Sequence, residues 1–315
     1  MKKLVIIIAA TMLGAGSLFA QDLASATEAY NNGITANEAG NVEMALQSFN
    51  EALVLAEAIG AEGAEIAEGC KSSIPILQFA LAKKAVNEAD YEKAVSGLKE
   101  TIAVANKYGK ADIADEAAAL IPQVLMQKAN GFFTAKDFAG AVNAYKEVLD
   151  ADATNAMAAL RLGAAYKGLG EKDSAVEAFK KAAELGQEKS AFKQLSTMYQ
   201  QDAAAALKAK KFDDAIAAAV ESNKYLETPK AYQLAGTAAT YAGKNKQSIE
   251  FFEKYLELAP TANNTGDILF SIAVAHQKMG DKVKAKEYYQ KAVAQTGKIN
   301  PKNLEAAKQQ IAAIK

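Results

Sequence analysis

Apolar residues recur three or four positions apart along most of the chain, a spacing typical of helices with one buried face. In the clearest stretch, Ala159 and Tyr166 share such a face before Gly170 interrupts the spacing. The spacing then resumes with Ala175 and Phe179. A glycine between two helical runs indicates the turn of a helical hairpin. This stretch therefore predicts two helices packed against each other.

The same apolar face recurs in seven segments. Each predicted second helix has a small residue, here called the anchor, at a fixed place. The anchors are Ala45, Ala94, Ala141, Ala175, Ala215, Ser248 and Ala285. The residues four positions later are Phe49, Leu98, Tyr145, Phe179, Ala219, Phe252 and Tyr289. Turn glycines stand five positions before four anchors, at Gly40, Gly170, Gly243 and Gly280. Asn41, Asp90, Asp137 and Asp281 stand where a side chain caps the second helix. Seven helical hairpins are the prediction.

The best copy resembles the tetratricopeptide repeat, whose pattern is W-x2-L-G-x2-Y, then A-x3-F, then P. The residues that match are Leu162, Gly163, Tyr166, Ala175 and Phe179, and Pro260 matches the closing proline of a later copy. The copy departs from the family at Ala159, where tryptophan is favoured. The resemblance implies an all-α, right-handed superhelical solenoid of about seven hairpins, with a concave groove that binds proteins or peptides.

The spacing between anchors predicts the boundaries of the repeat units. The array spans residues 21–300, with units near 26–60, 64–108, 111–155, 156–189, 190–228, 229–262 and 266–299. Residues 301–315 form a capping helix. Ala64–Pro75 matches Ala111–Pro122 at an offset of 47 positions, so the second and third units share an extra helical stretch. Pro75 and Pro122 should each kink that helix or start the next one.

Residues 1–20 have the pattern of a secretory signal peptide. Lys2 and Lys3 precede an apolar run from Leu4 to Ala10, and Ala20 is a small residue at the expected cleavage site. Cleavage would leave Gln21 first; an uncleaved anchor is the alternative. No later apolar run approaches the ~18 residues of a membrane helix. We therefore expect a periplasmic or secreted protein without a membrane span after cleavage.

Composition gives little support for catalysis or nucleic-acid binding. The 36 basic and 37 acidic side chains nearly balance, whereas nucleic-acid binding needs a basic stripe. Cys70 is the only cysteine, so it is expected as a small buried residue, with an intermolecular thiol as the alternative. His276, the only histidine, falls in a packing slot. We predict no catalytic residue, metal or cofactor; an envelope hydrolase with an unrecognised acidic site is the distant alternative.

The helical register places a set of mixed apolar and polar residues on the groove face of the first helices. These candidates are Phe79, Met126, Asn130, Phe133, Met157, Leu160, Arg161 and Phe270. These residues could bind the apolar side chains and the backbone of a partner protein. The alternative is that they pack against neighbouring first helices and leave no binding site. A carboxylate clamp like that of chaperone-binding members is disfavoured, since Met157, Gln127 and Phe79 occupy clamp positions. The sequence thus predicts a non-catalytic interaction module or scaffold of the cell envelope. A self-assembling scaffold, with homotypic contacts through its ends or Cys70, is the alternative.

Overall fold

The computed structural model describes residues 17–314, in which helices are joined by turns and loops and no β-strand occurs. The chain divides into two compact units, unit 1 up to Ala158 and unit 2 from Ala159 onward. Most of the predicted signal peptide lies outside the described residues, and α1 (Ser17–Glu38) includes the expected cleavage position. Export therefore stays a prediction.

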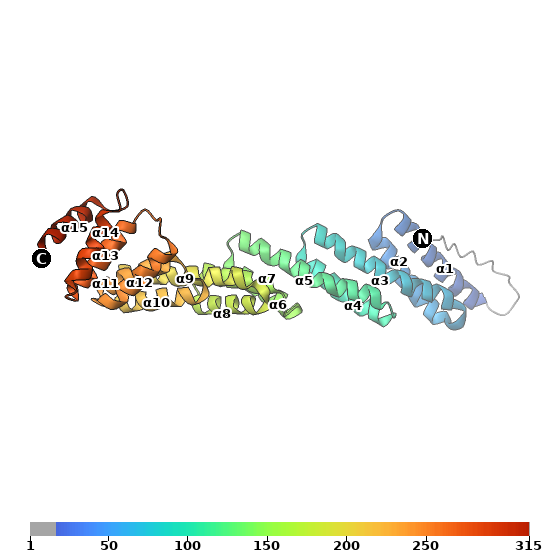
Figure 1. The fold of residues 1–315 in the computed structure, drawn as a ribbon. Helices are drawn as coiled ribbons and strands as arrows, with labels where there is room; N and C mark the ends of the chain where they lie inside the picture. The colour runs from blue at the N-terminus through green and yellow to red at the C-terminus, as the bar shows by residue number, and fades with distance from the viewer. Residues whose placement is uncertain (1–16, 315) are drawn as a thin grey trace. The chain divides into compact units, whose positions relative to one another are not determined.

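Unit 1 contains three helical hairpins. Their helices are α1 with α2 (Val42–Ile59), α3 (Ala64–Asn87) with α4 (Tyr91–Lys107), and α5 (Ala111–Thr134) with α6 (Phe138–Ala151). A short 3-10 turn, η1 (Gly60–Gly63), joins α2 to α3. Each helix packs against the next, and α3 also contacts the first helices on either side, α1 and α5 (Figure 1). First helices in unit 1 therefore share one layer.

Unit 2 continues the pattern with shorter helices. It begins with α7 (Ala156–Leu169, whose first residues belong to unit 1), α8 (Lys172–Ala182), α9 (Glu188–Lys208) and α10 (Phe212–Tyr225). A kink at Gly186, where φ is 102°, separates α8 from α9. The remaining helices are α11 (Pro229–Tyr241), α12 (Asn245–Leu258), α13 (Thr265–Lys278), α14 (Lys282–Val293) and α15 (Pro301–Ala313). The last helix, α15, packs on α14 and α13. Residues 17–314 thus form an all-α repeat solenoid of seven hairpins and a terminal helix.

Burial confirms the predicted repeat register. All seven anchors are fully buried, and the residues four positions later are at most 3% exposed. The first helices present a glycine to the large rings: a Cβ added to Gly163 would lie 2.7 Å from Phe179, and one added to Gly236 would lie 2.7 Å from Phe252. Glycine therefore lets these two hairpins close around a large ring.

The turns within the hairpins all use left-handed backbone. The four predicted glycines have φ between 72° and 80°. Ala89, Lys136 and Lys210 occupy the same turn position in the remaining hairpins, with φ of 58°, 61° and 60°. The sequence did not indicate these three, because residues with a Cβ seldom adopt this conformation. The side chains of Asn41, Asp90, Asp137 and Asp281 cap the following helices, as predicted.

Pro75 and Pro122 lie inside continuous helices. Both α3 and α5 are 24 residues long, compared with 14 for α7, which confirms the extra helical stretch in the second and third hairpins. Neither proline starts a new helix. Within residues 17–314, no helix combines the length and the apolar character that a membrane span requires.

Candidate functional site

The exposed face of α5 contains an open pocket of about 510 Å³. Its walls are Ala119, Pro122, Gln123 and Met126 of α5 together with Asp152 and Asn155 of the loop after α6. The α5 residues lie three or four positions apart, so they share one helical face. The pocket therefore has an apolar floor and a polar rim, all within unit 1.

The loop after α6 is held by its own side chains. The Asp152 carboxylate accepts hydrogen bonds from the Thr154 hydroxyl (2.7 Å) and the Thr154 backbone N–H (3.0 Å). These bonds lower the pKa of Asp152, so the rim of the pocket stays negative. The Asn155 side chain accepts a bond from the backbone N–H of Ala158 at 3.0 Å. Two fixed oxygen acceptors therefore lie beside the apolar floor.

Met126 is the predicted candidate that lines the pocket. It is half-buried, and Gln123, which also lines the pocket, is exposed three positions earlier on α5. Asn130 lies one turn further along, is exposed, and accepts a 2.7 Å bond from the Tyr145 hydroxyl. Met157 is 43% exposed. Of the eight predicted candidates, Met126 alone lines this pocket, and the binding role of the others stays a prediction.

Phe79 and Phe133 have packing roles inside unit 1. Phe79 is 8% exposed and belongs to a core cluster that includes Val124 of α5, so contact between neighbouring first helices covers it. Phe133 is half-buried and packs edge-on against Phe138 and Tyr145 of its own hairpin, with ring centroids 5.6 and 6.4 Å apart. The structure corrects the expectation that Phe79 is an exposed groove residue.

Three candidates fall in unit 2. Leu160 is half-buried and Arg161 is exposed on α7. Phe270 packs against Tyr289 and against the cluster that contains Ala307 and Ile314 at the C-terminal end of the chain. Asn300 and Asn303 donate hydrogen bonds to Asp267. The Gln277 amide donates one to Gln310 of α15, so the α15 region covers the same face of α13. The chain's own last helix therefore occupies the face on which Phe270 was expected to meet a partner.

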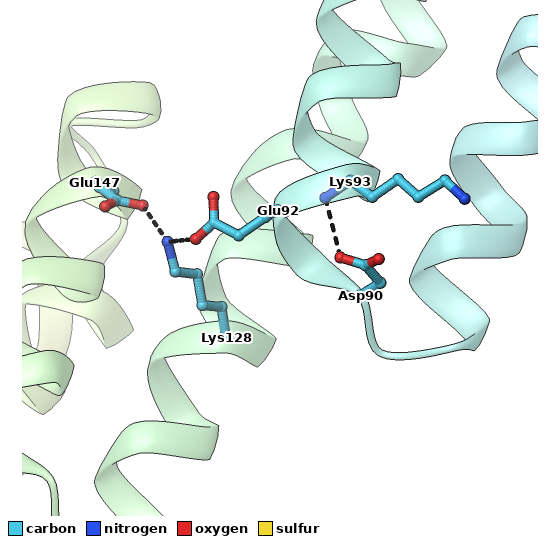
Figure 2. Close-up of polar contacts among 5 residues, drawn as sticks. All are labelled: Asp90, Glu92, Lys93, Lys128 and Glu147. Carbon is cyan, nitrogen blue, oxygen red and sulfur yellow. Dashed lines mark hydrogen bonds and ion pairs between the residues drawn. The ribbon is translucent and has the colours of Figure 1, made fainter.

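The opposite side of α5 carries an ion triplet that ties the second and third hairpins together. Figure 2 shows the Lys128 ammonium between Glu92 of α4, at 2.7 Å, and Glu147 of α6, at 3.0 Å. Desolvation alone would lower the pKa of Lys128, but the hydrogen bonds to both carboxylates outweigh it, and the pKa is raised. Lys128 is the only basic residue of α5, so it leaves the exposed face without a cation.

The exposed face of α5 continues from the pocket toward the start of the helix. Asp112, Asp115 and Glu116 are exposed and lie on the face that includes Ala119 and Gln123. We call these five residues and Met126 the α5 stripe. The acidic half of the stripe, and Asp152 beside it, were not among the candidates, because charge along the sequence looked evenly interspersed.

Neither of the two residues singled out for chemistry is placed to react. Cys70 is fully buried, and burial raises its thiol pKa to about 12. This confirms the packing interpretation and removes a Cys70-mediated contact between copies. His276 is 6% exposed and stacks on Tyr288, with its Nδ1 3.5 Å from Asp281. Among residues 17–314, no group of three or more metal-binding side chains gathers.

Comparisons with known proteins find similarity over parts of the chain. Models of the tetratricopeptide repeat match residues 132–199, and also 229–261 with 266–296. No curated protein matches the chain. Solved structures similar to it include MamA (26% identity, 56% of this chain, 92% of that chain, TM-score 0.36). Another is YrrB, a TPR protein with an unusual peptide-binding site (18% identity, 59% and 91% coverage, TM-score 0.35). Residues 132–199, 229–261 and 266–296 of this chain are therefore similar to tetratricopeptide repeats.

Proposed function

We propose that this chain is a non-catalytic protein-interaction module that binds an extended segment of a partner protein on the α5 stripe. The observation that carries the proposal is the pocket that the exposed Gln123 lines together with Met126, a candidate groove residue of the repeat register. Solenoids of stacked helical repeats use such faces to bind peptides and protein segments.

The pocket has the size and chemistry for side chains of a partner. Its volume of about 510 Å³ lies within the range of small-molecule sites, which is ample for one or two side chains. Met126 is flexible and polarisable, so it can adapt to different apolar groups. The exposed Gln123 supplies an amide group that can bind the partner's backbone. An apolar floor with a polar rim is typical of protein interfaces.

A catalytic role has less support. Asp152 is the one carboxylate in the pocket wall. Hydrolysis by paired acids needs two carboxyl groups flanking the bond that breaks. The only histidine is buried against Tyr288 rather than presented to the pocket. A binding surface is therefore the better account of this geometry.

Site-specific photo-crosslinking in the native host tests the proposal directly. A photoreactive residue replaces the exposed Gln123 in one strain and Met44 in another, since Met44 is 56% exposed but lies on the second helix α2. We expect a discrete crosslinked partner from position 123 and none from position 44. Crosslinks from position 44 alone, or equal products from both, would contradict the proposal.

The contribution of the pocket is then measured with the crosslinked partner. Met126→Ala should weaken binding at least about tenfold, or ~1.4 kcal/mol, because apolar anchors in a pocket dominate binding energy. The control is Met44→Ala, which removes a methionine side chain from α2, the second helix of the first hairpin. Equal affinity of both variants, with helical content unchanged, would remove the pocket from the binding site.

We further propose that the chain acts in the cell envelope or outside the cell. The basic start and broken apolar run of residues 1–20 support this location. In that setting the partner segment would belong to an exported or envelope protein. Determining the first residue of the protein from its native host tests this part separately.

A further inference from the structure

We propose that the partner segment presents a lysine or arginine side chain to the α5 stripe. This inference rests on the proposed function and specifies the chemistry of the ligand. The stem of such a side chain would lie on Pro122 and Met126, with its charge beside Asp152 and the acidic half of the stripe. The proposal depends on a difference between two similar hairpins.

The second hairpin neutralises the equivalent face from within the chain. Lys71 of α3 lies 3.3 Å from Glu57 and 3.6 Å from Glu68. The ammonium of Lys110 donates a 3.0 Å hydrogen bond to the Ser72 hydroxyl on the same helix. Two ammonium groups of the protein itself are therefore held on or beside α3.

The third hairpin keeps acids on this face but lacks both ammonium groups. At the offset of 47 positions, Asp112 and Asp115 of α5 correspond to Glu65 and Glu68 of α3. The residue that corresponds to Lys71 is Ala118, and Met157 stands 47 positions after Lys110. The face has also gained Glu116 in place of Gly69. The third hairpin therefore has more net negative charge on this face than the second.

Internal charges of unit 1 do not offset this excess. Lys128, the one basic residue of α5, lies between Glu92 and Glu147 on the opposite side of the helix (Figure 2). Among the ion pairs of residues 17–314, none includes Asp112, Asp115 or Glu116. The helix macrodipole favours acids only in the first turn, which explains Asp112 but neither Asp115 nor Glu116.

The carboxylates are close enough to act together on a cation. Neighbours three or four positions apart on a helix lie about 5–6 Å apart, which is within the ~8 Å Debye length at physiological salt. A long side chain with an apolar stem and a charged end matches an apolar floor beside a negative rim. A glutamate-rich or aspartate-rich segment would be repelled.

Selection of random peptides on the protein tests the inference. Displayed random dodecapeptides are captured on the wild-type chain and on Met126→Ala. Peptides lost with Met126→Ala report the pocket. We expect lysine and arginine to be at least about twofold enriched among them. Pocket-dependent peptides without basic enrichment would overturn this inference and leave the proposed function standing. A selection with no pocket-dependent peptide would contradict both.

Charge variants in the two hairpins give the matched comparison. One enriched peptide, labelled with fluorescein, is titrated with Asp115→Asn/Glu116→Gln and with the control Glu65→Gln/Glu68→Gln, which removes the same charge from α3. The α5 variant should bind about threefold to tenfold more weakly, since exposed charge pairs contribute modestly. The control should bind like wild type. Equal affinities of the two variants would overturn the inference.

Restoring the missing ammonium should have the same effect as removing the acids. Ala118→Lys places a cation where α3 has Lys71, so it should also weaken binding of the labelled peptide about threefold or more. High salt should abolish the difference between Ala118→Lys and wild type, because it screens exposed charges. A difference that persists in high salt, or tighter binding by Ala118→Lys, would contradict an electrostatic role for the stripe.

Discussion

Replacing Gly163 with alanine should destabilise the fourth hairpin, although alanine is the better helix former. Gly163 lies inside α7, where alanine would normally gain about 0.8–1 kcal/mol over glycine. An added Cβ would lie 2.7 and 2.8 Å from ring atoms of Phe179. Phe179 is fully buried, so its ring has no open space to enter. Overpacking of this kind costs about 1–3 kcal/mol, so after the helix gain of about 1 kcal/mol the net loss should be ~1 kcal/mol.

Gly131→Ala is the control substitution, in which the added Cβ contacts no other atom. Gly131 lies near the end of α5, is exposed, and an added Cβ would meet nothing within 4 Å. The substitution should therefore raise stability by about 0.5–1 kcal/mol. Urea unfolding followed by helical circular dichroism gives both midpoints. We expect Gly163→Ala to lower the free energy of unfolding and Gly131→Ala to raise it. A gain in stability from both substitutions would refute the contact between Gly163 and Phe179.

A compensating substitution separates this contact from other effects. The second hairpin uses Ala82 and Leu98 at the corresponding positions, both buried in one cluster. Phe179→Leu should therefore be less harmful in the Gly163→Ala background than alone, with a coupling free energy of about 0.5–3 kcal/mol. If the two free-energy changes simply add, the ring of Phe179 does not limit position 163.

Three further predictions concern the turns, the thiol and the N-terminus. Ala89→Gly should stabilise the chain by about 0.5–1 kcal/mol because φ is 58° there, while Gly40→Ala at φ 75° should destabilise it; equal urea midpoints would argue against the left-handed turns. With a pKa raised to about 12, the Cys70 thiol stays protonated at mildly alkaline pH. It should resist a thiol reagent until denaturant is added, and rapid labelling of the folded protein would show that it is accessible. Mass spectrometry of protein from the native host should find Gln21 as the first residue, and an intact Met1 would exclude cleavage.

Sequence periodicity predicted the hairpins because their core repeats at fixed spacing. The anchors from Ala45 to Ala285 are fully buried. The capping residues were predictable for the same reason, since each stands four positions before its anchor. The turns at Ala89, Lys136 and Lys210 were not, because left-handed backbone has no signature in residues that carry a Cβ. Their conformation follows from the packing of the helices on either side.

The helical register predicted on which face of a helix a residue lies, but not whether that face is exposed to solvent. It placed Phe79 and Phe270 on the faces of α3 and α13, but it contained no information on which neighbouring element covers each face. Val124 lies in the same core cluster as Phe79, and the C-terminal helix covers Phe270. The face of α5 differs, because a pocket remains open beside Met126. A residue can therefore bind a partner only if it lies on the groove face of its helix and no neighbouring helix covers that face.

Charge on the α5 stripe was hidden for a related physical reason. A formal charge of −1 and interspersed signs describe the whole chain, whereas binding depends on which charges remain unpaired after folding. Folding places Lys128 between two carboxylates and Lys71 beside Glu57 and Glu68. Each of these lysines is therefore not available to neutralise the exposed carboxylates of α5. Because Ala118 stands where the preceding hairpin has Lys71, the negative charge of the stripe persists. Local imbalance can thus arise in a chain that is balanced overall, and it gives this face a preference for basic partners.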